Sequence, residues 1–163
     1  MTTVRPLHPG AVPGLYRAWQ ALRQYNASLD PRIIPTPVSE AEFGIAAREL
    51  IERPVAAAFI AEDAGEVVGF ITGAIEQNQP DRLPERHATI GYLYVEPTRR
   101  REGIGRALID AAREWAAKQE GVSHIEMTVL AQDIDAARFW QAVGFTPFIQ
   151  RLWAPLEPPG DAE

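Results

Sequence analysis

The residues of this chain best suited to chemistry lie in one short stretch, VEPTRRREGIGR, at residues 95–106. Its four arginines, set against Glu96 and Glu102, give a local charge of +2, although the whole chain carries a formal net charge of -6. Gly103 and Gly105 lie where the pattern predicts that a helix begins. The stretch is therefore predicted to bind a small polyanion.

A helix start can bind an anion because the N–H groups of its first turn lack partners within the helix and carry partial positive charge. Glycine in a helix costs about 1 kcal/mol relative to alanine, and close approach of a diphosphate would explain why two occur here. The alternative is that Gly103 and Gly105 only permit tight packing between strand and helix, with solvated arginines. The stretch has no lysine and no third glycine, which argues against a P-loop and a dinucleotide fingerprint.

A long amphipathic helix must follow, because Ile104, Leu108, Ala112 and Trp115 recur at helical spacing before Gly121. Apolar runs predict strands on both sides of it, and a strand, helix and strand in succession imply a parallel pair with a right-handed crossover. Predicted strands cover residues 3–7, 56–61, 67–75, 88–95, 124–130 and 148–153, and three further helices lie within residues 12–22, 43–54 and 134–143.

The run EDAGE at residues 62–66 has the composition of a hairpin turn, so the two strands that it joins are predicted to pair antiparallel. Parallel and antiparallel pairs together make a mixed sheet. The predicted fold class is α/β, with a central mixed sheet that is antiparallel in its N-terminal half and has helices on its faces.

Composition narrows the function classes. A chain of 163 residues with 46% hydrophobic content predicts a single domain, residues 1–156, followed by a disordered tail, residues 157–163. The absence of cysteine excludes disulfides and thiol nucleophiles, and three scattered histidines do not indicate a metal. The acidic balance disfavours nucleic acid and anionic membranes as partners, and no signal peptide is evident, so a cytoplasmic location is expected.

The chain resembles the GCN5-related N-acetyltransferase (GNAT) superfamily. The family signature, Gln/Arg-x-x-Gly-x-Gly/Ala after a strand, is present as RREGIG at residues 100–105. Three further features fall in the family order: VEP at residues 95–97, the turn DAGE at residues 63–66 before VVGF, and the run AARFWQAVGF at residues 136–145. Together they cover roughly residues 3 to 153, and the ordered set is far more specific than one motif.

The resemblance implies transfer of an acetyl group from acetyl-CoA to a small-molecule or peptide amine by direct attack in a ternary complex. Two parallel strands would splay apart, the pantetheine arm would bond to the strand that ends at Val95, and a backbone N–H near Tyr94 would stabilise the oxyanion. The implied coenzyme-binding residues are Tyr94, Val95, Arg100, Arg101, Glu102, Gly103, Ile104, Gly105, Arg106, Asp133, Ala136 and Trp140.

The chain departs from the family at the two positions that usually move protons. Thr89 stands where many relatives have a glutamate base, and Trp140 where a tyrosine often protonates the leaving thiolate. Neither side chain can do that work. Tyr92, Tyr94 and His87 are nearby alternatives, of which Tyr94 and Tyr92 are the catalytic candidates.

The acceptor site is predicted to involve Tyr25 and Tyr92, because the loop after Tyr25 borders that site in the family. The missing proton-transfer residues leave a second function open, that of an acyl-CoA-binding sensor or assembly module without turnover. A third is an α/β interaction domain that binds no coenzyme. A sheet edge left open after Phe145 favours a homodimer.

Overall fold

The structure is a computed structural model that describes residues 1–157, so the predicted tail lies outside the described residues except for Glu157. The chain divides into two compact units, Met1–Asp133 and the residues from Ile134 onward. Among the helices of residues 1–157, none is long and apolar enough to cross a membrane.

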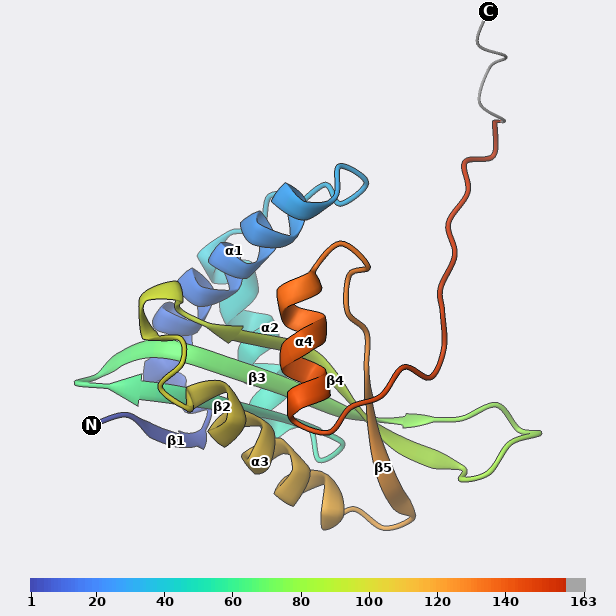
Figure 1. The fold of residues 1–163 in the computed structure, drawn as a ribbon. Coiled ribbons are helices and arrows are strands. Elements are labelled where there is room, and N and C mark those ends of the chain that lie inside the picture. Colours follow the sequence, from blue (N-terminus) through green and yellow to red (C-terminus); the bar gives the residue numbers. More distant parts are fainter. Residues whose placement is uncertain (158–163) are drawn as a thin grey trace, which may run out of the picture. The chain divides into compact units, whose positions relative to one another are not determined.

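The first unit is built on a five-stranded sheet whose strands lie side by side in chain order (Figure 1). Neighbouring strands from β1 to β4 pair antiparallel, and β5 pairs with β4 in parallel. This confirms the predicted α/β fold with a mixed sheet that is antiparallel in its N-terminal half. The strands are β1 (Thr3–Pro6), β2 (Ala56–Asp63), β3 (Glu66–Gln77), β4 (Arg86–Val95) and β5 (Val122–Met127).

The predicted hairpin turn joins β2 to β3 through Ala64 and Gly65, whose φ angles are 49° and 83°. Two successive positive φ angles match the right-handed twist of the flanking strands. Glycine adopts this conformation without a steric penalty, which explains its place in the turn.

β4 contains a bulge at Gly91, because Thr72 pairs with Tyr92 whereas the next residue of β3, Gly73, pairs with Ile90. A Cβ on Gly91 would lie 2.9 Å from Thr72 Oγ1, so glycine is required for this close approach. Thr72 Oγ1 instead accepts a hydrogen bond of 3.1 Å from the Tyr92 backbone N–H. The bulge redirects the strand just after its last pair with β5, which joins Ile90 to Met127.

The parallel strands β4 and β5 part early. Their last register pair joins Ile90 to Met127, whereas β4 continues to Val95. Within the described residues, positions 91–95 of β4 have no paired residue in β5. The splayed parallel pair that the family resemblance implies is thus confirmed.

Helices cover both faces of this sheet (Figure 1). Phe70 belongs to the core beneath α1 (Val12–Leu29), which also contacts α2 (Glu40–Glu52). A Cβ on the neighbouring Gly69 would instead lie 3.3 Å from Leu108 of α3 (Ile104–Ala117). Successive strand residues point to opposite faces, so α3 lies on the other side of the sheet from α1.

The second unit contains α4 (Ile134–Ala142), close to the predicted bounds. Gly144 ends the helix with a φ of 98°, and the ring of Phe145 lies 4.9 Å from that of Trp140. The predicted strand at residues 148–153 is wrong, because these residues have no strand conformation. Pro147 and Pro155 flank the segment and lack an N–H, and an apolar segment forms a strand only with a partner to pair with.

Candidate coenzyme and acceptor site

The arginine- and glycine-rich stretch forms a tight turn between β4 and α3. It passes through a short 3-10 helix, η2 (Pro97–Arg99), and then two residues with positive φ, Arg101 at 69° and Gly103 at 83°. Gly103 is the N-cap of α3. The stretch therefore lies at a helix start, as the sequence predicts.

The first turn of α3 is open to a ligand. Its N-cap makes no side-chain hydrogen bond, and no acidic residue occupies the first turn. A Cβ on Gly103 would meet nothing within 4 Å, so the space in front of the helix start is clear of other atoms of the described residues. Uncapped N–H groups facing clear space fit a diphosphate.

Arg99 plays a different part from the one that the charge count suggests. Its guanidinium pairs with Asp63 at 2.9 Å and with Glu102 at 3.0 Å, and the hydrogen bonds that it donates to Glu102 and then to Asp63 raise its pKa. Arg99 therefore anchors the turn to the β2–β3 hairpin and is not a free charge for an anion. Of the four arginines in the stretch at residues 95–106, Arg99 thus has a structural role.

Arg100 links the turn to the end of β4 and to α1. Its Nε donates a hydrogen bond of 3.1 Å to the Val95 carbonyl, and its guanidinium lies 6.0 Å from the ring centre of Tyr25. The Tyr25 hydroxyl is 3.2 Å from Asp133 Oδ1. Four predicted site residues, from α1, β4, the turn and the loop after β5, are thus brought together.

A buried carboxylate, Asp30, supports this arrangement through an ion pair with the half-exposed Arg32. Asp30, which is 3% exposed, accepts hydrogen bonds from Arg32 and, at 2.8 Å, from Gln132 beside Asp133. Hydrogen bonds from Arg32 hold the pKa of Asp30 well below its usual range, so this carboxylate is ionised at neutral pH. The hydrogen bond from Gln132 to Asp30 fastens the end of α1 to the loop that carries Asp133, and sequence reasoning did not identify it.

Tyr94 and Tyr92 lie on the part of β4 that has left β5. Tyr94 packs against the core at 6.1 Å from the ring of Phe70, whereas Tyr92 is 44% exposed. Burial, followed by the charge of Glu96, raises the pKa of Tyr94. At neutral pH Tyr94 therefore keeps its proton and can give up a proton as an acid but cannot serve as a phenolate base.

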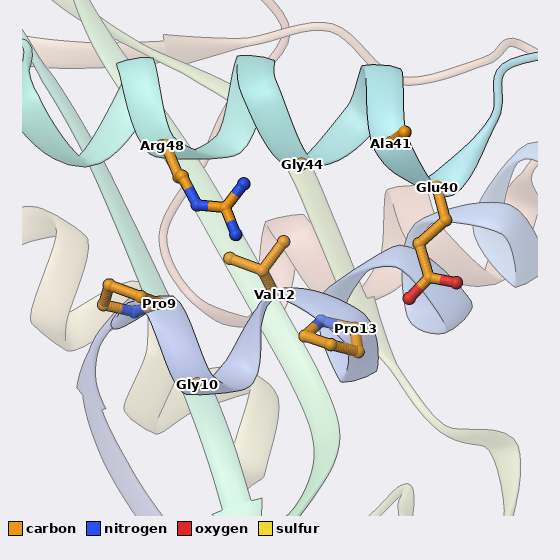
Figure 2. Close-up of a pocket in the computed structure, with 8 residues that line it drawn as sticks. All are labelled: Pro9, Gly10, Val12, Pro13, Glu40, Ala41, Gly44 and Arg48. Carbon is orange, nitrogen blue, oxygen red and sulfur yellow. The ribbon is translucent and has the colours of Figure 1, made fainter.

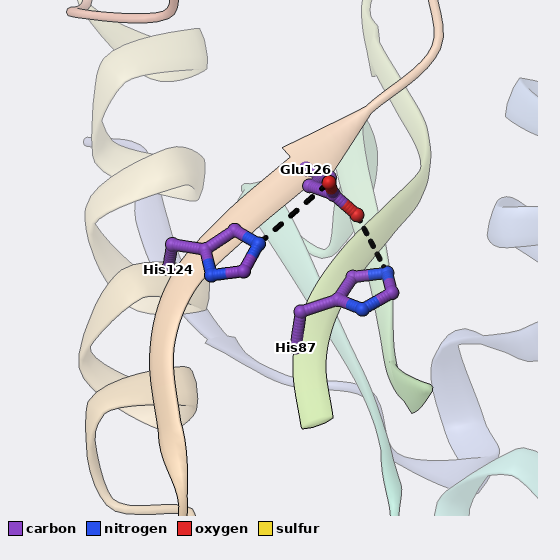
Figure 3. A group of neighbouring side chains, drawn as sticks. All are labelled: His87, His124 and Glu126. Atoms are coloured by element: carbon purple, nitrogen blue, oxygen red, sulfur yellow. Dashed lines mark ion pairs between the residues drawn. The ribbon is translucent and has the colours of Figure 1, made fainter. Parts of the chain in front are cut away.

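A cluster that the sequence analysis missed lies where β4 and β5 are still paired (Figure 3). Glu126 Oε2 is 2.7 Å from His87 Nε2, and its Oε1 is 3.6 Å from His124 Nε2. The imidazole rings stack with centres 5.6 Å apart and planes 13° apart. The spacing of His124 and Glu126, two apart in a predicted strand, was the one available signal, because it places both on one face.

Glu126 is also the register partner of Thr89. Ile90 pairs with Gly73, whose Cβ direction points to Trp115 of α3, so Thr89 faces the side away from α3. The structure thus places a carboxylate directly beside the position where the family resemblance implies a glutamate.

Residues 19–145 match the family model described as the Acetyltransferase (GNAT) family. The chain belongs to this family. Over 100 residues it is 29% identical to the L-2,4-diaminobutyric acid acetyltransferase of Streptomyces coelicolor, a match that covers 61% of this chain and 53% of that protein. The chain spans about half the length of the curated relatives that it matches.

Two solved structures show the same fold. AAC(6')-Iy in complex with the bisubstrate analog CoA-S-monomethyl-acetylneamine has a TM-score of 0.73 and 17% identity, covering 97% of this chain and 99% of that chain. A mutant of the BH1408 protein from Bacillus halodurans has a TM-score of 0.82 and 17% identity, covering 95% and 99%. These likenesses support the GNAT fold.

The remaining predicted coenzyme contacts of this GNAT chain, Ala136 and Trp140, lie on α4 in the second unit. Trp140 packs against Phe139 and Phe145 there, with ring centres 5.6 Å and 4.9 Å apart. Their contact with coenzyme stays a prediction, as does that of Glu102, Ile104, Gly105 and Arg106.

A hollow elsewhere in the first unit takes no part in this site. It lies between the start of α2 and the segment formed by η1 (Pro9–Ala11) and the start of α1 (Figure 2). None of the predicted coenzyme or acceptor residues lines it. The lining residues are Pro9, Gly10, Val12, Pro13, Glu40, Ala41, Gly44 and Arg48.

Proposed function

We propose that this GNAT chain is an N-acetyltransferase that moves the acetyl group of acetyl-CoA to the amine of a small molecule or peptide. The observation that carries the proposal is the uncapped, glycine-led start of α3, directly after a strand that has parted from its neighbour. The relative from Streptomyces coelicolor is named for acetylating a small diamino acid, which supports a small-molecule acceptor.

The chain's own groups would hold the coenzyme. Backbone N–H groups of residues 101–106 would bind the diphosphate, and Arg100 would add charge beside it. On its β5 side, the backbone of residues 91–95 has no paired residue and would bond the pantetheine arm like an added strand. Asp133 would line the arm further along. Ala136 and Trp140 are also proposed to contact the coenzyme.

Acetyl-CoA supplies the activated acyl group once it is bound. A backbone N–H at Tyr94 or Val95 would stabilise negative charge on the carbonyl oxygen, which elsewhere contributes about 3 kcal/mol. The protonated phenol of Tyr94 would donate to the leaving thiolate, a role that Trp140 cannot fill. The exposed Tyr92, together with Tyr25, would line the acceptor site.

Several expectations from sequence stay predictions. Residues 1–156 are proposed to work as one domain, in a cytoplasmic enzyme without a metal requirement and without nucleic acid or membrane partners. A homodimer is also proposed, because β5 is an edge strand and Phe148, Ile149 and Leu152 are at least 69% exposed. Light scattering of the purified chain would test it.

The test of the activity is release of CoA, followed with a thiol reagent, while a panel of amines is offered with acetyl-CoA. The panel includes L-2,4-diaminobutyrate and an aminoglycoside. We expect CoA release with at least one amine, and thermal stabilisation by acetyl-CoA without any amine, about 2.7 kcal/mol at 100-fold its dissociation constant. Stabilisation without CoA release would identify a sensor, and neither effect would identify a domain that binds no coenzyme.

A further inference from the structure

We infer that Glu126 accepts the proton of the acceptor ammonium, and so supplies on β5 the carboxylate that β4 lacks at Thr89. The inference rests on the proposed function and names a catalytic residue for it. Three features of the structure support this role for Glu126: the strand register, the contacts within the cluster of Figure 3, and the point at which β4 and β5 part.

The strand register places Glu126 close to the point where β4 and β5 separate. Thr89 and Glu126 are paired, and the next pair, Ile90 with Met127, is the last before the strands separate. His87 precedes Thr89 by two residues and contacts Glu126 at 2.7 Å, so these side chains share one face. The carboxylate therefore borders the gap in which the proposed coenzyme arm would end.

His87 positions this carboxylate. Its Nδ1 is buried and has no hydrogen-bond partner among the residues that the structure describes, so a proton there would be unsatisfied. We therefore place the ring proton on Nε2, the nitrogen that lies 2.7 Å from Glu126 Oε2. Glu76 also faces His87, with its Oε2 3.9 Å from Nε2.

The other carboxylate oxygen can receive a ligand. Glu126 Oε1 lies 3.6 Å from His124 Nε2, which is too long for a hydrogen bond, and the Glu126 side chain is 28% exposed. One oxygen is thus held by a buried imidazole while the other faces a half-open site. This arrangement suits an anion that must keep its orientation and still meet an ammonium group.

The acetyl transfer conserves atoms and charge. The acceptor ammonium gives one proton to Glu126 Oε1, and the neutral amine nitrogen then bonds to the thioester carbonyl carbon. The C–S bond breaks and leaves its electron pair on sulfur as a thiolate. The nitrogen loses a second proton, and the thiolate takes up one proton to become the thiol. Glu126 returns its proton to solvent past His124, whose side chain is 38% exposed. One ammonium and one thioester become one amide, one thiol and one proton.

The same three residues could be considered as metal ligands, because their donor atoms all lie within 4.8 Å of one another. A metal bonded to both imidazoles must lie near the plane of each ring, about 2 Å from its nitrogen. The ring planes are 13° apart and the ring centres 5.6 Å apart. His87 Nε2 and Glu126 Oε2 are already in direct contact at 2.7 Å, and the experiment below includes metal removal and return.

The experiment compares Glu126→Gln with wild type, using the amine that wild type acetylates fastest and its fluorinated and alkoxyamine analogues of lower amine pKa. We expect kcat/KM to fall about 100-fold or more for the basic amine. The loss should shrink steadily for analogues that are already neutral at the assay pH. Affinity for acetyl-CoA should stay within about twofold, since the diphosphate site is elsewhere.

Two further sets of variants sharpen the result. Glu114→Gln removes an equal charge from the surface of α3, where Glu114 pairs with Lys118, and should leave kcat/KM unchanged. His87→Gln keeps an N–H donor for Glu126 and should retain most activity, whereas His87→Leu should lose it with the same dependence on amine pKa.

An equal loss for all amines, or no loss, would overturn the role of Glu126 while leaving the proposed function intact. Activity that disappears with EDTA and returns with Zn²⁺ would also overturn it and identify a metal site. A wild-type chain that binds no acetyl-CoA and releases no CoA would overturn the proposed function itself.

Discussion

After the carboxyl end of β4, the candidate coenzyme site consists of consecutive residues whose backbone would do the binding. In the first half of β4, the candidate proton-transfer site instead combines Thr89 and His87 with Glu126 from the neighbouring strand. The residues of the first site belong to one sequence motif. The residues of the second site come from two strands and are brought together only by the pairing of those strands. A backbone site tolerates change in its side chains but not in its φ angles, whereas a side-chain site depends on single atoms.

The sharpest way to break this comparison is at Gly103. Gly103→Val forces a β-branched residue into a φ of 83° and fills the clear space before α3, so affinity for acetyl-CoA should fall at least about tenfold. Isothermal titration calorimetry measures the change. Gly65→Val is the matched control, because Gly65 has the same φ of 83° and equally clear surroundings in the β2–β3 turn.

Both glycine variants should lose about 1–2 kcal/mol of unfolding free energy from the left-handed conformation. Only Gly103→Val should lose coenzyme affinity. Equal affinities for the two variants would remove the diphosphate from the start of α3.

The bulge at Gly91 separates the two sites, and Gly91→Ala tests whether it is required. The new Cβ would lie 2.9 Å from Thr72 Oγ1, so we expect a loss of about 1–3 kcal/mol in unfolding free energy, measured in urea. Thr72→Ala in the same chain should recover part of that loss. A double variant no more stable than Gly91→Ala alone would contradict this contact as the cause.

A smaller effect is expected where α1 meets the site. Tyr25→Phe removes the hydroxyl that lies 3.2 Å from Asp133 and should cost about 1 kcal/mol in unfolding free energy. Affinity for acetyl-CoA should fall a few-fold. Tyr16→Phe is the control. Tyr16 lies on the same helix as Tyr25, and its hydroxyl donates a hydrogen bond to the Val38 carbonyl. Its loss should cost similar unfolding free energy without changing affinity for acetyl-CoA.

The smallest effect is expected at Asp63, the carboxylate that pairs with Arg99 of the turn. Hydrogen bonds from the N-terminal amine of Met1 and then from Arg99 lower the pKa of Asp63. A carboxyl with a lowered folded-state pKa contributes stability above its unfolded pKa of about 3.9 and loses it as the pH falls through the folded value. Asp63→Asn should therefore be less stable than wild type at neutral pH.

That difference should shrink as the pH is lowered below about 3.9, because wild-type Asp63 becomes protonated as the pH falls through its lowered folded-state pKa. Urea unfolding at each pH measures it, with Asp81→Asn, in an exposed loop, as control. A difference that grows in acid would contradict the assigned direction.

Much of the fold could be predicted because its signals are local. The stripe of Ile104, Leu108, Ala112 and Trp115 marked α3, and the turn at Ala64 and Gly65 marked the hairpin, since periodicity and backbone conformation are carried by neighbouring residues. The predicted strand at residues 148–153 failed for the opposite reason. Its apolar pattern is local, but pairing requires a partner that no local pattern names.

The sequence by itself determined the helix start that would hold a diphosphate, because glycine at a positive φ and free N–H groups are properties of a few consecutive residues. Only the tertiary structure decided that Arg99 is an anchor and that Glu126 faces Thr89. Parallel strands joined through a long crossover have a register set by packing across the whole sheet. That register brings together atoms that are far apart along the chain.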